Sequence, residues 1–453
     1  MSDVNGMSEL LDIGDRIVAQ ARPGEQVEVV VGRSTSTEIR AYRGDVEQFT
    51  SATGAGVGVR VVAGGRQGFA YAESLDPEVV AEVLADARDN ATFASHDEWL
   101  GLAEPDGVPV PQLDLYRESA GAVSASAKIE LALDLERAVA AADSRIAAVE
   151  SADYADGISE GAVVSTTGMR TFSRESSCYV SAHCVATEGD DTQTGFGFSV
   201  GRSIEDLDLD RAAGDAARRA TRLLGASKPA SGRMTVVLDP YVTAQFLAII
   251  GSTLSGEAVL KGRSIFGDRM GEAIAAGGFT LVDDATNPLA YSASETDGEG
   301  LASRRNVLIE GGVLRGFVHN AYTARRAGTT STANAVRGIA STPGVGCRAL
   351  ALQPGIHDQG ELLAAVGDGV LISSVSGLHS GVNAVSGDFS AGAEGLRIRD
   401  GAMAEPLREF TIASTLQRMI SEVGEVGSDI EWLPMRAAGV SLVVGDVTVS
   451  GLS

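Results

Sequence analysis

A plan of three strands followed by a helix occurs twice in the first half of the chain, and this duplication limits the possible folds more than any other feature. Residues of the two copies match at a nearly constant offset of 123 positions, with a small insertion before the last matches. The matching pairs are Phe49 with Phe172, Val62 with Val185, Ala63 with Ala186, Phe69 with Phe196 and Tyr71 with Phe198. The period is too long for a solenoid repeat, so the pattern predicts two similar sheet-plus-helix units. Chance similarity between two antiparallel meanders is the alternative.

Each copy is predicted to be an antiparallel meander covered by a helix. In the first copy the strand-like segments are VEVVVG, STEIRAY, EQFTSA, GVGVRVVAG and QGFAYAE, and we expect glycine-containing loops between several of them. Asp76 and Pro77 then mark a helix start, because the aspartate side chain caps free amides and proline fits the first turn. In the second copy the helix is expected from about residue 208 to 224, with Gly225 as its stop.

Linker and helix patterns divide the chain into three predicted domains. A short amphipathic helix is expected near residues 9–21 and another at about 125–142, and the proline-containing stretch EPDGVPVPQ between them is typical of a linker. We therefore predict an N-terminal α/β meander domain at residues 1–110, a second sheet-plus-helix unit at 111–228 and a β-rich C-terminal domain at 229–453.

The C-terminal segment combines strands with one apolar helix and a long polar loop. Strand MTVVLD leads into a helix that starts after Asp239 and Pro240. Gly311-Gly312 and Asp400-Gly401 have the composition of two-residue hairpin turns. Helices and antiparallel strands that are segregated in this way favour the α+β fold class over a doubly wound sheet.

The charge of the chain argues against nucleic acids and anionic membranes as partners. Its formal net charge is −25, whereas binding to phosphates needs clustered Lys and Arg. The three cysteines, Cys178, Cys184 and Cys347, are too few and too scattered for a disulfide framework or a Cys-x-x-Cys zinc site. No apolar signal core is evident at the start, and no apolar run approaches the roughly 18 residues of a membrane helix. We expect a cytoplasmic protein.

Motifs that carry chemistry are scarce. The chain has five histidines, and no two of them have the spacing of a metal-binding helix: His96, His183, His319, His357 and His379. No Gly-x-Ser-x-Gly elbow occurs. The glycine-rich segments GGVLRG and GVGVRVVAGG lie on predicted strands or hairpins, where a dinucleotide-binding turn is not expected.

The densest group of polar residues is SGLHSGVNAVSGDFSAGAEG, residues 376–395. It holds one His, one Asn, one Asp and one Glu among serines and glycines, and such glycines allow a ligand to approach the backbone closely. An ordinary pair of glycine-rich loops is the alternative interpretation.

That segment, together with NVLIEGGVLRGF, AYTARRAG, STANA and GSDIEWLP, resembles the C-terminal part of the TldD/PmbA family, once described as modulators of DNA gyrase. The most specific motif is Val382-Asn383 followed by Ser386-Gly387-Asp388-Phe389. The motif DGEG at residues 297–300 is weaker. The N-terminal half matches the family in layout more than in motif.

The resemblance implies a pair of subunits, in which a TldD-type chain is a zinc metallopeptidase with His-Glu-x-x-x-His on a helix and a cysteine near its C-terminus. Alignment on IFGDRMGE puts Leu247, Ala248 and Ser252 at the His, Glu and His positions, and Ala438 near the cysteine position. None of these side chains resembles the zinc ligands or the general base that such chemistry uses. The resemblance is therefore to the TldE, or PmbA, branch, and it implies no catalytic residue and no metal in this chain.

The expected function is that of a non-catalytic TldE/PmbA-like subunit of a heterodimeric zinc metallopeptidase that degrades or trims unfolded peptides, with zinc supplied by a TldD-type partner. We expect His379, Asn383 and Asp388 to line the peptide-binding chamber. One alternative is a peptidase that works alone with His319, His379, Asp388 or Glu299. Another is a regulatory binding protein without proteolytic activity.

Overall fold

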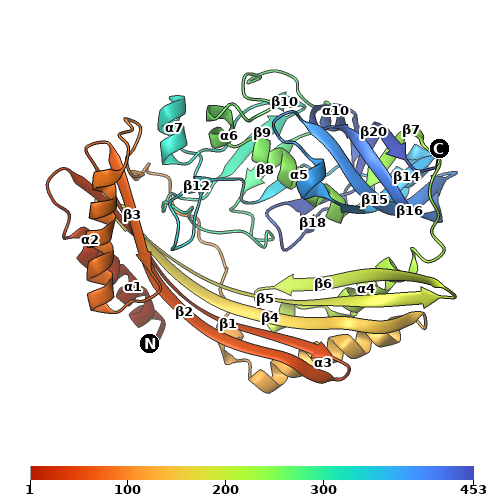
Figure 1. The fold of residues 1–453 in the computed structure, drawn as a ribbon, viewed down its shortest axis with the longest axis horizontal. Coiled ribbons are helices and arrows are strands. Elements are labelled where there is room, and N and C mark those ends of the chain that lie inside the picture. Colours follow the sequence, from red (N-terminus) through yellow and green to blue (C-terminus); the bar gives the residue numbers. More distant parts are fainter. Residues whose placement is uncertain (1, 453) are drawn as a thin grey trace.

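The computed structural model describes residues 2–452 and has two parts that face each other, a curved N-terminal sheet and a β-rich C-terminal part (Figure 1). The mixed architecture confirms the predicted α+β fold class. Among the described residues, no helix is long and apolar enough to cross a membrane.

The two predicted units join into one six-stranded sheet of order β3-β2-β1-β4-β5-β6. Its strands are β1 (Glu25–Tyr42), β2 (Asp45–Ala63), β3 (Arg66–Ala72), β4 (Ile146–Ser165), β5 (Arg170–Glu188) and β6 (Asp191–Gly201). The units meet where β1 pairs antiparallel with β4, with Gly32 opposite Gly161. The first strand of each unit therefore lies at the centre of the sheet, and the third strand lies at its edge.

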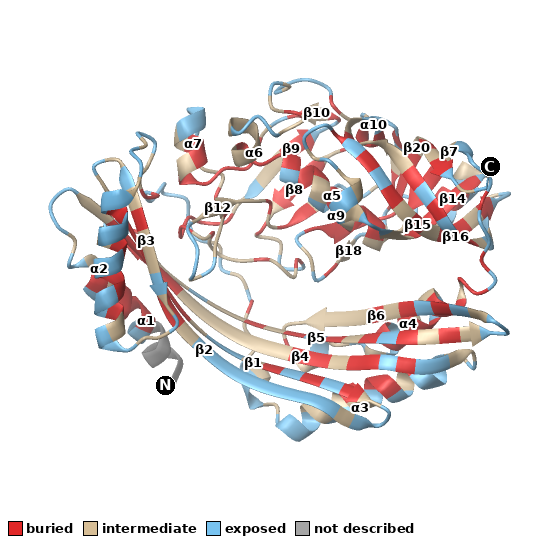
Figure 2. Cartoon of the chain, viewed as in Figure 1, coloured by how far each residue is buried: buried red, intermediate tan, exposed pale blue. Residues whose placement is uncertain are grey.

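Four helices cover one face of this sheet: α1 (Ser2–Val18), α2 (Pro77–Phe93), α3 (Ala125–Ala142) and α4 (Leu209–Thr221). Alternate residues of β1 such as Val27 and Val29 pack against α1 and α2. Glu28 and Val30 lie between them in sequence and point to the opposite face, because side chains alternate along a strand. Figure 2 shows buried residues alternating along the strands beside these helices. The face without helices is turned towards the C-terminal part (Figure 1).

Both units bring helix and strand together in the same way, which supports duplication over chance similarity. A Cβ at Gly68 in β3 would overlap the carbonyl oxygen of Ala87 in α2. At the corresponding place in the second unit, a Cβ at Gly195 in β6 would overlap the carbonyl oxygen of Ala216 in α4. Glycine is needed at both positions because the helix backbone lies directly on the strand.

The strands of the first unit are longer than predicted. In two places where a loop was expected between two strands, the structure has one continuous strand. VEVVVG and STEIRAY form the single strand β1, and EQFTSA continues into GVGVRVVAG as the single strand β2. Gly58 lies inside β2, where a Cβ would overlap the carbonyl oxygen of Ile339 from the C-terminal part. A Cβ at Gly32 in β1 would lie 3.1 Å from Cδ1 of Ile339. These glycines mark close approach of another segment rather than turns.

The C-terminal part contains a six-stranded sheet, a four-stranded sheet and short helices. The larger sheet has the order β16-β15-β14-β7-β20-β17, and its strands are β7 (Gly232–Leu238), β14 (Gly369–Ser376), β15 (Asp388–Arg399), β16 (Ala402–Thr415), β17 (Val423–Val426) and β20 (Leu442–Ser450). The smaller sheet has the order β10-β9-β8-β13, and its strands are β8 (Leu281–Asp284), β9 (Arg305–Glu310), β10 (Val313–Leu314) and β13 (Leu350–Leu352). Short pairs are formed by β11 (Ala335–Val336) with β12 (Gly344–Val345), and by β18 (Glu431–Trp432) with β19 (Ala438–Gly439). The helices are α5 (Pro240–Thr253), α6 (Gly256–Leu260), α7 (Ala321–Ala327), α8 (Gln359–Val366), α9 (Leu378–Gly381) and α10 (Leu416–Ser421).

The helix start and the two hairpin turns predicted for the C-terminal part are confirmed. The Asp239 side chain accepts a hydrogen bond from the backbone N–H of Tyr241 and caps α5. Both glycines of the turn between β9 and β10 have positive φ, 54° at Gly311 and 79° at Gly312. The turn between β15 and β16 likewise has φ values of 50° at Asp400 and 75° at Gly401. Positive φ at both central residues is the geometry of a type I′ hairpin.

Candidate functional site

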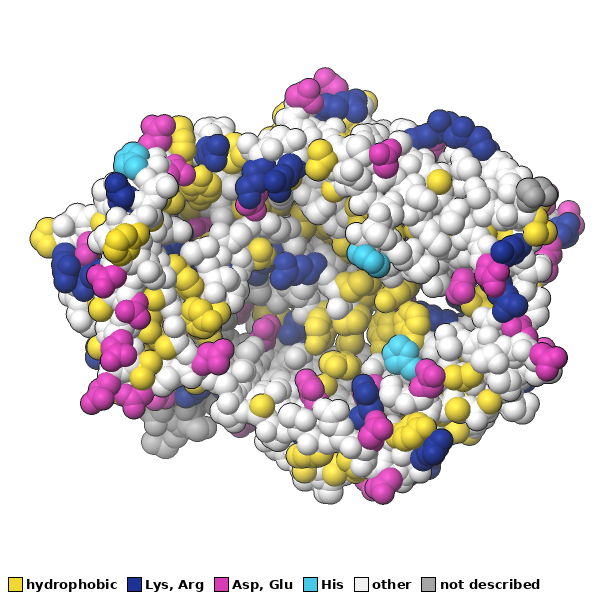
Figure 3. All heavy atoms as spheres, viewed as in Figure 1, with side chains coloured by type: hydrophobic (Ala, Val, Ile, Leu, Met, Phe, Trp, Pro, Cys, Tyr) yellow, Lys and Arg dark blue, Asp and Glu magenta, His cyan; other side chains and the backbone are white. Residues whose placement is uncertain are grey.

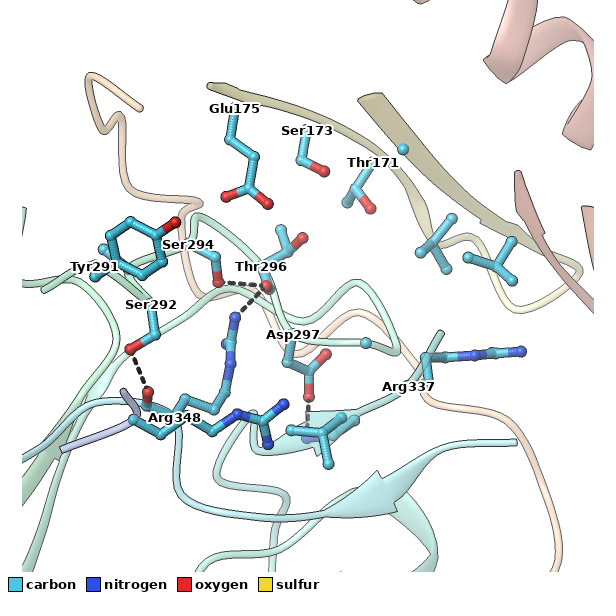
Figure 4. A pocket seen from close by; sticks show the side chains of 18 of the residues that line it. Thr171, Ser173, Glu175, Tyr291, Ser292, Ser294, Thr296, Asp297, Arg337 and Arg348 are labelled. Carbon is cyan, nitrogen blue, oxygen red and sulfur yellow. Dashed lines mark hydrogen bonds between the residues drawn. The ribbon is translucent and has the colours of Figure 1, made fainter. Parts of the chain in front are cut away.

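A cleft of about 570 Å³ lies between the open face of the sheet and the C-terminal part. Figure 3 shows the molecule hollowed between its two parts. Thr171, Ser173 and Glu175 of β5 form one wall, and the segment from Tyr291 to Asp297 lies opposite (Figure 4). The wall residues are two positions apart because alternate side chains of a strand share a face.

A group of buried charges lies beside the cleft, which one of its members, Arg337, lines. We call it the charged joint: Glu28, Arg60, Glu299 and Arg337. In the sheet, Arg60 donates to both carboxylate oxygens of Glu28, from Nε at 3.0 Å and from Nη2 at 2.8 Å. Arg60 Nη2 also lies 3.3 Å from Oε1 of Glu299, in the C-terminal part. Arg337, also from the C-terminal part, pairs with Glu28. The joint fixes the sheet to the C-terminal part through two opposite-charge pairs.

The charges in this joint are almost completely removed from water, with exposed side-chain fractions between 0% and 4%. Burial favours the neutral acid, but the charges of Arg60 and Arg337 hold the pKa of Glu28 below its ordinary value. Glu299 has fewer partners, and burial together with the nearby charge of Glu28 raises its pKa although Arg60 opposes the shift. The second oxygen of Glu299 accepts from the backbone N–H of Ala321 at 2.9 Å.

Asp297 lies beside this joint and lines the cleft. Its carboxylate accepts backbone N–H groups from Glu299 and Leu301 on one oxygen and from Ala335 on the other, at 2.9 to 3.0 Å. Burial, with the nearby charge of Glu299, nevertheless raises the pKa of Asp297 to about 7. The carboxyl therefore changes its charge near neutral pH, inside the wall of the cleft.

We expect Asp297 to make the protein less stable as pH rises. The folded state holds the proton up to a pKa of about 7 and the unfolded state only up to about 3.8. Between these values the folded state binds more protons, so the free energy of unfolding falls as pH rises, by on the order of 4 kcal/mol in total. Urea unfolding between pH 4 and 8 measures this slope. Asp297→Asn is expected to flatten it, and an unchanged slope in that variant would contradict the assignment.

An aromatic group also links the sheet to the C-terminal part, and we call it the aromatic joint: Phe196, Phe198, Arg219 and Tyr241. The ring of Tyr241 in α5 lies 5.0 Å from that of Phe196 and 6.3 Å from that of Phe198, both in β6. The guanidinium of Arg219 in α4 stands 4.3 Å from the Phe196 ring centre, within the range of cation–π attraction. In the first unit, the ring centre of Phe69 lies 5.9 Å from the guanidinium carbon of Arg337. The duplicated aromatic position therefore contacts the C-terminal part in both units.

Two arginines of the C-terminal part carry positive charge into the cleft. Arg348 donates to the hydroxyl oxygen of Ser303 at 2.9 Å and to the carbonyl oxygen of Thr296 at 2.8 Å, and both acceptors are neutral. Arg436 is exposed, and its backbone carbonyl oxygen accepts the N–H of Leu350 at 2.9 Å. Burial lowers the pKa of Arg348; the charge of Arg436 also lowers it, whereas Asp297 opposes the shift.

The three predicted peptide-binding residues lie close together, but outside the cleft described above. His379 is in α9, Asn383 follows it, and Asp388 begins β15; all three are exposed. Asn383 accepts the backbone N–H groups of Val385 and Ser386. None of the three is among the residues that line the cleft described above. Their part in peptide binding stays a prediction.

The residues of the stand-alone alternative are spread over different surroundings. His379 and Asp388 are on the exposed segment, whereas His319 is buried, and Nδ1 of His319 lies 3.2 Å from the hydroxyl of Thr323. Burial lowers the pKa of His319. Glu299 belongs to the charged joint. Within residues 2–452, no three side chains of His, Cys, Asp or Glu are grouped so that they could hold a metal ion.

The residues at the metal-helix positions do not fit zinc. Leu247 is 0% exposed in the core of the C-terminal part, and Ala248 and Ser252 are exposed on α5. The Ser252 hydroxyl donates to the carbonyl oxygen of Ile249 at 2.6 Å. Ala438 lies in β19, and a Cβ at the next residue, Gly439, would press on the backbone of Pro240 at the start of α5. The fold thus brings the two aligned regions together, with aliphatic and hydroxyl side chains that are not zinc ligands.

Sequence analysis missed the arginines of the cleft and the charged joint. A signal for the joint was present, since Glu28 and Arg60 interrupt the apolar runs VEVVV and GVRVV, and a charge on a buried strand needs a partner. For Arg436 the only hint was its position two residues after the family-like segment GSDIEWLP.

Comparison with known proteins agrees with this architecture. Three domain models of one family match in order: PmbA/TldA metallopeptidase domain 1 over residues 27–91, the central domain over 118–224 and the C-terminal domain over 231–452. A metalloprotease of Methanothermobacter thermautotrophicus is 28% identical over 432 residues, covering 93% of this chain and 90% of its own length. Metalloprotease PmbA of Escherichia coli O157:H7 is 26% identical, covering 95% of this chain and 94% of its own.

Solved structures with the same fold include TldE from Thermococcus kodakarensis, with a TM-score of 0.88 at 23% identity over 98% of this chain and all of the other. A protein of Thermotoga maritima described as a putative modulator of a DNA gyrase has a TM-score of 0.89 at 24% identity, covering 97% of this chain and 99% of its own. These likenesses concern the fold. The domain models span most of the chain in the expected order, and the chain belongs to the TldD/PmbA family of metallopeptidases.

Proposed function

We propose that this chain is the TldE-type subunit of a two-chain peptidase, in which a TldD-type partner holds zinc and carries out hydrolysis of unfolded peptides. The observation that supports this most directly is the set of side chains on α5. Leu247 packs into the core, and Ala248 and Ser252 offer a methyl group and a hydroxyl towards solvent. Such groups neither bind zinc nor take a proton from metal-bound water.

The role left for this chain is to shape the enclosure in which a peptide is held. The open face of its sheet and the C-terminal part form the two sides of the cleft. In the assembly, extended peptides would be bound mainly through their backbones and so with little regard to sequence, as when a strand is added to a sheet edge. His379, Asn383 and Asp388 remain the proposed contacts on the exposed segment beside α5 (Figure 2).

A reconstitution experiment tests the proposal. The purified chain is expected to hold well under one zinc per molecule by elemental analysis and to leave a fluorogenic unfolded peptide intact. Adding a separately purified homologue that carries His-Glu-x-x-x-His is expected to give zinc-dependent cleavage and a co-eluting complex. Cleavage by this chain alone, with stoichiometric zinc that His319→Ala or His379→Ala removes, would support the stand-alone alternative and defeat the proposal.

A further inference from the structure

The cleft is positively charged at one place, although the chain as a whole carries a formal charge of −25. The four members of the charged joint balance one another, with two acids and two arginines. Glu175 has Arg202 at 3.6 Å as its opposite charge. Arg348 uses two N–H groups on neutral oxygens. The remaining acid in the lining is Asp297, whose pKa of about 7 leaves it partly neutral at physiological pH.

Arg436 adds a cation that the described residues do not neutralise. Within residues 2–452 its guanidinium takes part in no side-chain hydrogen bond or ion pair, and more than a third of the residue is exposed. Its backbone is fixed by the bond to Leu350 and by the bridge between Leu350 and Ala437. A guanidinium presents a planar fork of donors that matches a carboxylate. A fixed backbone with an unused fork, near a second arginine, is suited to bind an anion that enters the cleft.

The opposite wall favours a peptide as the source of that anion. Thr171, Ser173 and Glu175 project from β5 at every second residue, and an extended peptide has the same two-residue repeat (Figure 4). Within residues 2–452, no protein hydrogen bond involves the hydroxyls of Thr171 or Ser173, so both are free to bind backbone groups.

We propose that Arg436, supported by the field of Arg348, binds the C-terminal carboxylate of an extended peptide that lies along β5 in the cleft. The inference rests on the proposed function in taking a peptide as the natural ligand. It also gives the direction in which the peptide lies in the cleft, since its C-terminal end is placed at the loop between β18 and β19. It also predicts that chains with a free carboxyl terminus are preferred.

Binding of two matched peptides to the isolated chain tests this inference. Both are uncharged seven-residue peptides of Ala, Ser and Thr with an N-terminal fluorophore, one with a free C-terminal carboxylate and one amidated. Fluorescence anisotropy is expected to show at least tenfold tighter binding of the acid, because a charge-assisted pair is lost in the amide. The preference is expected to shrink as NaCl rises from 0.05 to 0.5 M.

Variants then identify the residue. Arg436→Gln is expected to weaken binding of the acid to the level of the amide, and Arg436→Lys to keep part of the preference, since lysine retains the charge without the fork. Arg263→Gln is the matched control, because Arg263 is also exposed in the C-terminal part but lies outside the cleft. Unfolding curves of all variants are expected to match the parent, since both side chains are exposed.

Several results would overturn the inference: equal binding of acid and amide, an unchanged preference in Arg436→Gln, or no binding of either peptide. Inorganic phosphate that displaces the acid at concentrations where acetate does not would identify a phosphate site instead. The assay contains neither partner nor zinc. Failure of the reconstitution experiment therefore leaves its result intact, and the two proposals can fail separately.

Discussion

Arg60→Ala is expected to lower the free energy of unfolding by about 3–5 kcal/mol, the range found when one member of a buried ion pair is removed. The change leaves Glu28 with a single cationic partner, Arg337, and leaves Glu299 with the backbone N–H of Ala321. Both acids are buried at 0–1% exposure, so water does not replace the lost guanidinium. The midpoint of urea unfolding, with the slope of the transition, measures the loss.

The pH dependence of this loss separates a buried charge from simple loss of volume. Without Arg60 the pKa values of Glu28 and Glu299 rise, so protonation relieves part of the cost as pH falls towards 5. The difference between variant and parent is therefore expected to be smaller at pH 5 than at pH 8. Arg40→Ala is the control on the same sheet, because Arg40 pairs with Asp153 while 46% exposed, and its loss is expected to cost under about 1 kcal/mol. Equal costs for the two variants would contradict the role of the joint.

Gly58→Ala is expected to destabilise the protein by roughly 1–3 kcal/mol through overpacking. The new Cβ would overlap the carbonyl oxygen of Ile339, which is backbone and has no rotamer by which to move away. The neighbouring segment includes Val336 and Arg337, which line the cleft. Its displacement is expected to speed amide hydrogen exchange there, measured by mass spectrometry on peptides covering residues 335–341.

Gly54→Ala provides the matched control four residues away on the same strand. A Cβ at Gly54 would have its nearest neighbour, the Ser34 hydroxyl oxygen, at 3.4 Å, an ordinary contact. The change is expected to stay within about 0.5 kcal/mol and to leave hydrogen exchange in the 335–341 segment as in the parent. If both variants behave alike, the close approach of Ile339 is not what requires glycine at position 58.

Local signals in the sequence predicted much of the fold correctly, because they depend on neighbours along the chain. The cap at Asp239, the turns at Gly311-Gly312 and Asp400-Gly401, and the helix at 125–142 were all confirmed. The duplicated units were also found, since both copies must build the same strands and helix.

Contacts between distant segments account for what was missed. The close approach at Gly58 could not be predicted, because its neighbour, Ile339, is 281 positions away in sequence. The charged joint combines residues 28, 60, 299 and 337, and no spacing rule connects them. Arg436 follows the family-like segment GSDIEWLP by two residues, but only the fold places it in the cleft.

The two joints attach the sheet to the C-terminal part at separate places, through β1 and β2 at the charged joint and through β6 at the aromatic joint. Two parts that are joined at one contact can rotate about it, whereas two separate contacts oppose that rotation. Each unit of the duplicated sheet thus carries one attachment to the C-terminal part. We therefore expect the distance between the sheet and the C-terminal part to vary little, so that the cleft keeps its width without a moving element.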